Sequence, residues 1–376
     1  MPELDTLRGL AILGVLLYHG LYWARDLSPF SPIQRRILSV ASVGQFGVNL
    51  FFVLSGFLIS GLLLDSKNRP DYYRRFYLRR ALRILPAYYL TLAVLVFFHL
   101  ISHGFLVMSL LYSSNLSLLF GIAMSYPVLW AVAVEQHFYI FWPVVVKRLS
   151  ERTLMGVTVA ILILTPFSRL FYHLHAAGLN EPRPGFDYYT WNVADSLAMG
   201  AFVCLWIRLR NSNREKVFGF SLTLLASGIA LAIGGWPDGV LTRRTPFGDA
   251  FQRVSSNLCF AALLGFFLLA GSGKWKDYVR PRLLLFFGRI SYGLFLFQLM
   301  FFILYNWLAR RTWFEHGWNL DAWARTWIAL AFAGTTSTLA AYLSRNYFEQ
   351  HFLDLKDLLS KPRGSSGGIS GRGNNS

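Results

Sequence analysis

The chain has 376 residues, of which 55% are hydrophobic and only 15% are charged, a composition far more apolar than that of soluble domains. Its formal charge of +17 would suit a nucleic-acid-binding protein, but no basic stripe is interleaved with stacking aromatics. Both cysteines, Cys204 and Cys259, lie in apolar segments, which argues against a disulfide framework or a cysteine metal site. The class that remains is a polytopic membrane protein.

Apolar windows of about 20 residues predict ten membrane-spanning helices. We therefore expect an all-α helical bundle over residues 1–359, followed by a disordered tail over 360–376 that is rich in Gly, Ser and Asn. The stretch 105–121 is also apolar, but its serines and asparagine favour a re-entrant or interfacial piece. The expected spans are residues 8–24, 44–65, 83–101, 127–147, 153–173, 188–208, 216–235, 254–271, 284–308 and 323–344.

The distribution of basic residues predicts the topology, because cytoplasmic loops of membrane proteins collect Lys and Arg. With the N-terminus inside, about two thirds of the 36 lysines and arginines fall on the cytoplasmic side. The connection 102–126, on the other side, has no Lys, Arg, Asp or Glu. Both termini are therefore expected in the cytoplasm.

Two ionisable residues interrupt apolar spans, His19 in the first and Glu135 in the fourth. Such residues cost at least about 2.5 kcal/mol each in a bilayer, which makes them functional candidates. At 1.5 Å per residue, His19 lies about 16 Å from Arg8, and Glu135 about 18 Å from the cytoplasmic face. The similar depth predicts that the carboxylate orients the imidazole, which then acts as a general base on a hydroxyl.

Each of these residues also has a structural interpretation. His19 could bond to a backbone carbonyl, and Glu135 could form an ion pair or a proton relay in a transporter. Arg8 could reach the headgroups, although Asp5 beside it favours a partner in the protein. His137 points about 200° away from Glu135 around the helix and is expected to pack outside the site.

An arginine cluster comes just before the third span. Arg83 follows Arg79 and Arg80 by four and three residues, so the three share a helical face suited to binding phosphates. A nucleotide-bearing donor such as coenzyme A would fit, and anionic lipid headgroups are the alternative. The whole cluster is Arg74, Arg75, Arg79, Arg80 and Arg83.

Other polar residues in the spans have weaker interpretations. Asp195 and Arg289 form either a structural ion pair or part of a polar acceptor site. Ser55 and the glycines of the second span are expected to serve close helix packing, because small residues let helices approach.

Several blocks, taken together, resemble the acyltransferase-3 family of membrane acyltransferases. The resemblance starts with the segment 4–11 (LDTLRGLA) and His19, and it continues in the same order through the rest of the chain. The further blocks are FFVLSGFLI at 51–59, FYLRRALRILPAYY at 76–89, VEQHFY at 134–139, ISYGLFL at 290–296 and RNYFE at 345–349.

The resemblance implies an acyl-CoA donor on the cytoplasmic side and an acceptor hydroxyl, commonly on a glycan or glycolipid, on the other. By position, Arg8 and His19 match the family's Arg and His pair, Glu135 its acidic residue, and Arg80 and Arg83 its basic pair. Gln298 stands where many members carry a histidine, and Ala131 where a serine is usual. Because Gln298 replaces that histidine, His19 is expected to be the single catalytic base.

The sequence therefore predicts an integral membrane acyltransferase, residing in the bacterial inner membrane, with membrane lipid around it and no nucleic-acid partner. The expected catalytic residues are His19, Glu135 and Arg8, with Arg8 or a nearby donor steadying the oxyanion. Arg79, Arg80 and Arg83 are expected to hold acetyl-CoA or another acyl-CoA. No metal and no permanently bound cofactor is expected. The oligomeric state stays open, with a homo-oligomer as one alternative.

One other mechanism of acyl transfer and two other functions stay open. An acyl-histidine relay would carry the acyl group covalently before transfer. A proton-coupled transporter or flippase for a lipid-linked sugar would use His19 and Glu135 as its relay. A purely structural scaffold would tolerate alanine at both positions.

Overall fold

The computed structural model describes residues 1–22, 30–179, 185–234, 245–271, 273–311 and 321–359, and these residues are almost entirely helical. The expected tail 360–376 lies outside the described residues. Long helices dominate, with short helical pieces between some of them. The helices are α1 Pro2–Tyr22, α2 Pro32–Ser42, η1 Val43–Phe46, α3 Gly47–Ser66, α4 Tyr72–Phe97, α5 His103–Leu110, η2 Ser114–Phe120, α6 Leu129–Arg148, α7 Glu151–Leu179, η3 Phe186–Tyr188, α8 Thr190–Leu209, α9 Arg214–Gly234, α10 Pro246–Gly271, α11 Arg282–Arg311, α12 Ala322–Leu343, η4 Ser344–Glu349 and α13 Gln350–Leu359.

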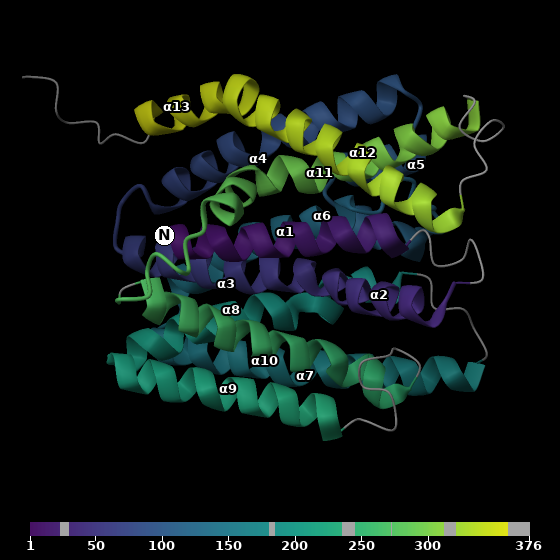
Figure 1. Cartoon of the computed structure of the whole chain (residues 1–376). Helices are drawn as coiled ribbons and strands as arrows, with labels where there is room; N and C mark the ends of the chain where they lie inside the picture. The colour runs from purple at the N-terminus through teal and green to yellow at the C-terminus, as the bar shows by residue number, and fades with distance from the viewer. Residues whose placement is uncertain (23–29, 180–184, 235–244, 272, 312–320, 360–376) are drawn as a thin grey trace, which may run out of the picture.

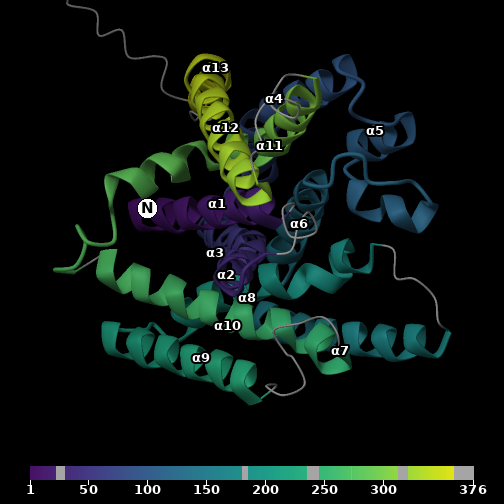
Figure 2. The same cartoon turned by 45° about the vertical axis from the view of Figure 1, so that its right-hand side comes forward.

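The long helices lie side by side in one bundle, with α1 and α3 in its interior (Figure 1). The helices α7, α9 and α10 form one side, and α4, α11 and α12 form the other. Figure 2 shows α5 at the margin of the bundle, away from α9. The N-terminus and α13 lie at the same end of the bundle (Figure 1).

Glycines bring four of these helices into backbone contact. A Cβ built on Gly288 of α11 would meet Asp5 O of α1 at 1.9 Å, and one on Gly47 of α3 would meet Ala11 O of α1 at 2.5 Å. A Cβ on Gly56 of α3 would meet Leu197 O of α8 at 1.9 Å. Any larger residue would push these helices apart, so α11, α1, α3 and α8 form a glycine-linked row. This confirms the packing role expected for the glycines of the second span.

Nine of the ten expected spans coincide with helices that are long and apolar enough to cross a membrane, as judged over the described residues. The tenth, α12, has 22 residues, but its run of hydroxyl residues lowers its hydropathy, and it is not among the nine. Four expected starts were too late by six residues or more. Two of them, at residues 8 and 254, correspond to α1 and α10, which begin at Pro2 and Pro246. The second span is extended by α2 and η1 to Pro32–Ser66, and α4 begins at Tyr72, so the arginine cluster lies inside the helix.

The stretch 105–121 does not form a spanning helix. It folds as α5 and η2, two short pieces, and polar side chains of η2 donate to a backbone carbonyl and to a side-chain hydroxyl of other segments. Ser114 donates to Leu129 O at 3.0 Å, and Asn115 Nδ2 donates to Thr190 Oγ1 at 3.0 Å. These bonds satisfy polar groups that would be costly in lipid.

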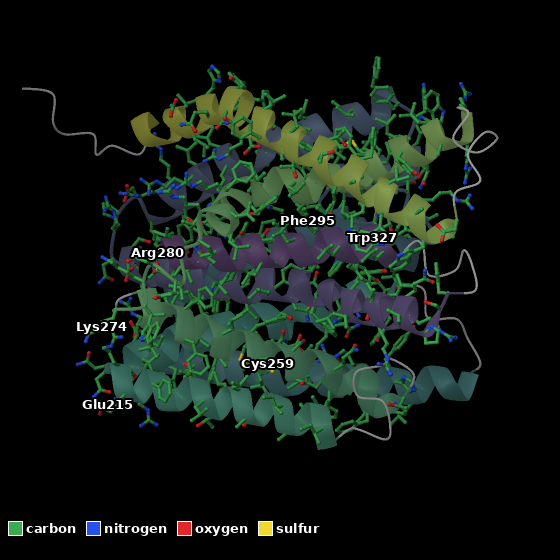
Figure 3. The ribbon with its side chains drawn as sticks, in the orientation of Figure 1. Glu215, Cys259, Lys274, Arg280, Phe295 and Trp327 are labelled. Atoms are coloured by element: carbon green, nitrogen blue, oxygen red, sulfur yellow. The ribbon has the colours of Figure 1, made fainter. Side chains whose placement is uncertain are left out.

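Charged side chains gather at the end of the bundle that holds the N-terminus, where Glu215, Lys274 and Arg280 lie (Figure 3). Arg280 donates to Glu3 Oε2 at 3.0 Å and so ties the start of α1 to the segment before α11. Phe295, in contrast, lies in the interior of the bundle (Figure 3). We call this charged end the N-terminal end.

Candidate active site

Arg8 lies in the second turn of α1, where its Nη1 donates to Asp5 Oδ1 at 3.3 Å. Its side chain is only 18% exposed, although the sequence places it at the edge of the membrane. The glycine contact between Gly288 and Asp5 brings α11 against this turn. Arg8 therefore faces the interior between α1 and α11.

A narrow cavity of about 80 Å³ adjoins the Arg8 side chain. Its walls come from five helices and carry two further arginines, one carboxylate and several hydroxyl groups. The polar members of its lining are Arg8, Ser55, Arg80, Arg83, Glu135, Tyr139, Ser291 and Tyr292. The structure thus brings together, in one cavity, residues that the sequence places far apart.

Two hydroxyl groups hold the Glu135 carboxylate. Ser55 Oγ of α3 and Tyr139 OH, one turn further along α6, both donate to Glu135 Oε1. The Arg80 guanidinium lies over the Tyr139 ring, with its Cζ 5.4 Å from the ring centroid. Glu135 is consequently a fixed negative charge between two hydroxyl donors, close to the arginines of the same cavity.

A second and wider cavity, of about 640 Å³, opens beside Met1 at the N-terminal end. Arg80 and Arg83 line both cavities, so the two adjoin at these residues. Of the described residues that line the wider one, only Asp65 is acidic. Its basic residues are Arg69, Arg75, Arg79, Arg80 and Arg83. Such a cavity suits a ligand with several phosphate groups.

His19 does not line either cavity. It lies about 16 Å further along α1 than Arg8, where its imidazole faces Gln298 of α11 and its ring is 5.5 Å from that of Tyr18. Among the described residues, the hydrogen-bond partners of Glu135 are Ser55 and Tyr139, and the expected contact with His19 is not formed.

The reason is the start of α1. The helix begins at Pro2 rather than at Arg8, so Arg8 already lies about 9 Å inside the helix. Its long side chain extends the reach further, and Arg8 rather than His19 comes to the level of Glu135. The expected site residues therefore form two groups, with Arg8, Glu135, Arg79, Arg80 and Arg83 around the cavities and His19 apart from them.

His137 lies outside the site, as expected. Its Nδ1 is 2.6 Å from Thr190 Oγ1 of α8, and it lines neither cavity. Asp195 was expected either to pair with Arg289 or to bind a polar acceptor, but its partner is Arg169. Arg169 Nη2 donates to Asp195 Oδ2 at 2.8 Å, with both side chains buried, whereas Arg289 is exposed.

Sequence reasoning missed several of these residues. Arg169 could have been found, since it is an arginine inside an apolar span, the same signal that selects His19 and Glu135. Ser55 and Tyr139 were not predictable as partners of Glu135, because Ser55 contacts it from another helix and its short hydroxyl looks like a packing residue. Gln298 stands out in the sequence because many family members carry a histidine there, but the sequence does not indicate that it faces His19.

Comparison with known proteins places the chain in a family. A family model described as an acyltransferase domain, of the acyltransferase-3 type, matches residues 1–345. The chain belongs to this family. With its many apolar helices, this acyltransferase-family protein is a multi-pass membrane protein.

The relatives are bacterial proteins that carry O-acetyltransferase names. This acyltransferase is 31% identical over 163 residues to the peptidoglycan O-acetyltransferase OatA of Listeria monocytogenes, covering 38% of the chain and 24% of the relative. It is 31% identical over 188 residues to the putative peptidoglycan O-acetyltransferase YrhL of Bacillus subtilis, covering 44% and 27%. The O-acetyltransferase OatA of Staphylococcus aureus is 30% identical over 176 residues, with 40% and 26% covered.

The matched part thus spans about a quarter of the length of these relatives. No solved structure matches the chain.

Proposed function

We propose that the chain transfers an acyl group, acetyl in the simplest case, from acyl-CoA to a hydroxyl group of a cell-envelope glycan. The observation that carries this proposal is the pair of adjoining cavities that share Arg80 and Arg83. The wide cavity is basic and open, while the narrow one leads into the bundle. This shape suits a donor whose charged end stays outside and whose reactive end enters.

The wide cavity would hold the phosphates of the donor. Arg79, Arg80 and Arg83 project from two successive turns of α4 and line it together. A guanidinium binds phosphate through two parallel N–H bonds. The described residues give neither Arg80 nor Arg83 a hydrogen-bonded protein acceptor, so both remain available to a ligand. The N-terminal end would then face the cytoplasm, where acyl-CoA is made.

The narrow cavity would take the pantetheine arm. Arg8 lines its wall, and Glu135 balances the positive charges there. Because Arg8 and His19 are about 16 Å apart along one helix, one thioester carbonyl cannot contact both. We therefore propose that Arg8 contacts the pantetheine arm of acyl-CoA. The oxyanion of the thioester would be stabilised by hydrogen-bond donors that lie nearer His19.

His19 would act as the general base. Its Nε2 takes the proton of the acceptor hydroxyl as that oxygen attacks the thioester carbon. The C–S bond breaks, and the imidazolium returns the proton to the departing thiolate of coenzyme A. The names of the relatives support a glycan of the cell envelope as the acceptor, which would approach from the end opposite the N-terminus.

The test is release of free coenzyme A from acetyl-CoA by the full chain in nanodiscs, with and without peptidoglycan fragments or envelope glycolipid. We expect acceptor-dependent release that falls to background in His19→Ala and in Arg80→Ala/Arg83→Ala. Arg289→Ala is the matched control, because Arg289 is exposed and lines neither cavity.

Labelled acetyl-CoA binding separates the two variants. His19→Ala should still bind the donor, and the arginine double variant should not. Absence of both release and binding with every acceptor fraction would contradict the proposal. Binding of a lipid-linked sugar without thioester cleavage would favour the transporter interpretation.

A further inference from the structure

A polar pair lies in the apolar core beyond the narrow cavity. Gln298 is fully buried in α11, between core residues on either side of it in the helix. Among the residues that the structure describes, neither of its amide atoms has a hydrogen-bond partner, and the buried Nδ1 of His19 has none either. Buried polar atoms are nearly always paired, so three unpaired atoms at one place indicate an arrangement that is completed during function.

The two side chains face each other. The imidazole of His19 lies next to the Gln298 amide, although its Nδ1 and the amide atoms form no hydrogen bond among the described residues. The helices that carry them, α1 and α11, are packed closely, and a Cβ on Gly20 would lie 3.1 Å from Phe302, one turn beyond Gln298. Catalytic hydrogen bonds are often long or misaligned without substrate and tighten in the complex.

The pair also continues the walls of the narrow cavity. On α1, the residues Arg8, Ile12, Val15 and His19 recur at helical spacing and share one face. On α11, Ser291 and Phe295 line the cavity, and Gln298 follows on the same face. His19 and Gln298 thus lie where the two cavity walls extend away from the N-terminal end.

We propose that Gln298 is a positioning residue for His19. Its Oε1 accepts the Nδ1–H of the imidazole, which holds the proton on Nδ1 and leaves the lone pair of Nε2 free for the acceptor hydroxyl. The other ring nitrogen of a histidine decides its tautomer in this way. This inference rests on the proposed function, and it gives Gln298 the orienting role that the sequence assigned to Glu135.

The amide also sets the basicity of His19. A carboxylate in this place would stabilise the imidazolium by its charge, whereas a neutral amide orients the ring without that stabilisation. The proton taken by Nε2 therefore passes readily to the thiolate of coenzyme A once the C–S bond has broken.

The activity test compares Gln298→Leu and Gln298→Glu in the full chain in nanodiscs. Gln298→Leu should lower kcat by about 100-fold with the KM for acetyl-CoA unchanged, since a wrong tautomer affects the chemical step. In Gln298→Glu the carboxylate should move the acidic limb of the pH–rate profile to higher pH by about one unit. The loss in His19→Ala/Gln298→Leu should not exceed that in His19→Ala, because the two residues act as a unit.

A wild-type kcat in Gln298→Leu, or an acidic limb that does not move in Gln298→Glu, would overturn the proposal. So would a change in the KM for acetyl-CoA alone.

A second measurement does not depend on turnover. The ¹⁵N spectrum of imidazole-labelled protein, with the His19 signals identified by their loss in His19→Ala, should show the Nδ1–H tautomer in wild type and a mixture in Gln298→Leu. The same tautomer mixture in both proteins would refute the role of Gln298, even if the chain is an acyltransferase. A fixed wild-type tautomer without any acyl transfer would instead contradict the proposed function alone.

Discussion

Arginines inside the bundle have different hydrogen-bond partners on its two sides. On the side of α7, α8 and α10, the buried Arg169 donates to Asp195 Oδ2, to Asn192 O and to Ala250 O, each at 2.8 Å. Around the cavities on the other side, the described residues provide no hydrogen-bonded acceptor for Arg80 or Arg83. An arginine saturated by protein acceptors stabilises the fold, whereas one that faces a cavity is available to a ligand.

The strongest test of this contrast is donor binding by Arg80→Ala/Arg83→Ala. Each charge-assisted hydrogen bond contributes about 1.5–3 kcal/mol, so the double variant should bind acetyl-CoA about 10²–10⁴-fold more weakly. Its thermal stability in detergent should stay close to wild type. A large loss of stability with unchanged acetyl-CoA affinity would show that these arginines are structural.

Arg169→Ala should give the reverse result. It leaves Asp195 as an uncompensated buried charge, which costs about 3–5 kcal/mol of stability. The measurement is thermal unfolding in detergent, together with acetyl-CoA affinity for the fraction that remains folded, which should be unchanged. Arg169→Met/Asp195→Leu should recover much of the stability because it removes both charges. A double variant less stable than Arg169→Ala would contradict this account.

Removal of one hydroxyl from Glu135 should have a smaller effect. Tyr139→Phe takes away one donor to Glu135 Oε1, a loss of about 1–3 kcal/mol in a buried site. We expect coenzyme A release to fall about tenfold, with normal expression. Tyr77→Phe is the matched control, because Tyr77 donates to Ile140 O at an exposed position. Equal losses in the two variants would argue against a role for this bond in the site.

The smallest expected effect concerns Glu349 in η4. It is buried and accepts a hydrogen bond from Ser344 Oγ at 3.1 Å, and burial raises the pKa of its carboxyl because the charged form loses its hydration. The folded protein then holds this proton more tightly, so its contribution to stability is full below the unfolded pKa. That contribution is lost as the pH rises through the folded pKa.

Thermal unfolding in detergent between pH 4 and 8 tests this. Glu349→Gln should flatten the pH dependence by less than about 1 kcal/mol, whereas Asp354→Asn, at an exposed position, should leave it unchanged. A wild-type slope in Glu349→Gln would contradict the expectation.

The sequence was most informative about the spans and the arginine cluster. Apolar length alone located all ten helices, nine of which are long and apolar enough to cross a membrane among the described residues, and helical spacing placed Arg79, Arg80 and Arg83 on one face of α4. Contacts between helices were harder, because apolar length does not fix the relative depth of two helices. The extra turns of α1 before Arg8 shifted the level of the site, and so His19 and Glu135 were wrongly paired.

The sequence also could not predict which side chains contact each other across two helices. By sequence, Asp195 could have met Arg169 or Arg289, which both lie in apolar segments, and only the packing of α7 against α8 selects Arg169. Likewise, nothing local in the sequence says that the imidazole of His19 faces Gln298, which lies on a helix some 280 residues later.

The glycine-linked row makes one wall of the bundle stiffer than the wall formed by α4. The helices α11, α1, α3 and α8 touch backbone to backbone, so they cannot separate without breaking many contacts at once. The helix α4 has no glycine and carries Pro86 in its interior, which removes one backbone hydrogen bond. The arginines that would bind the donor thus sit on the more compliant wall, while His19 and Gln298 sit on the rigid one. Under the proposed function, bending of α4 would admit a bulky donor without moving His19 and Gln298 relative to each other.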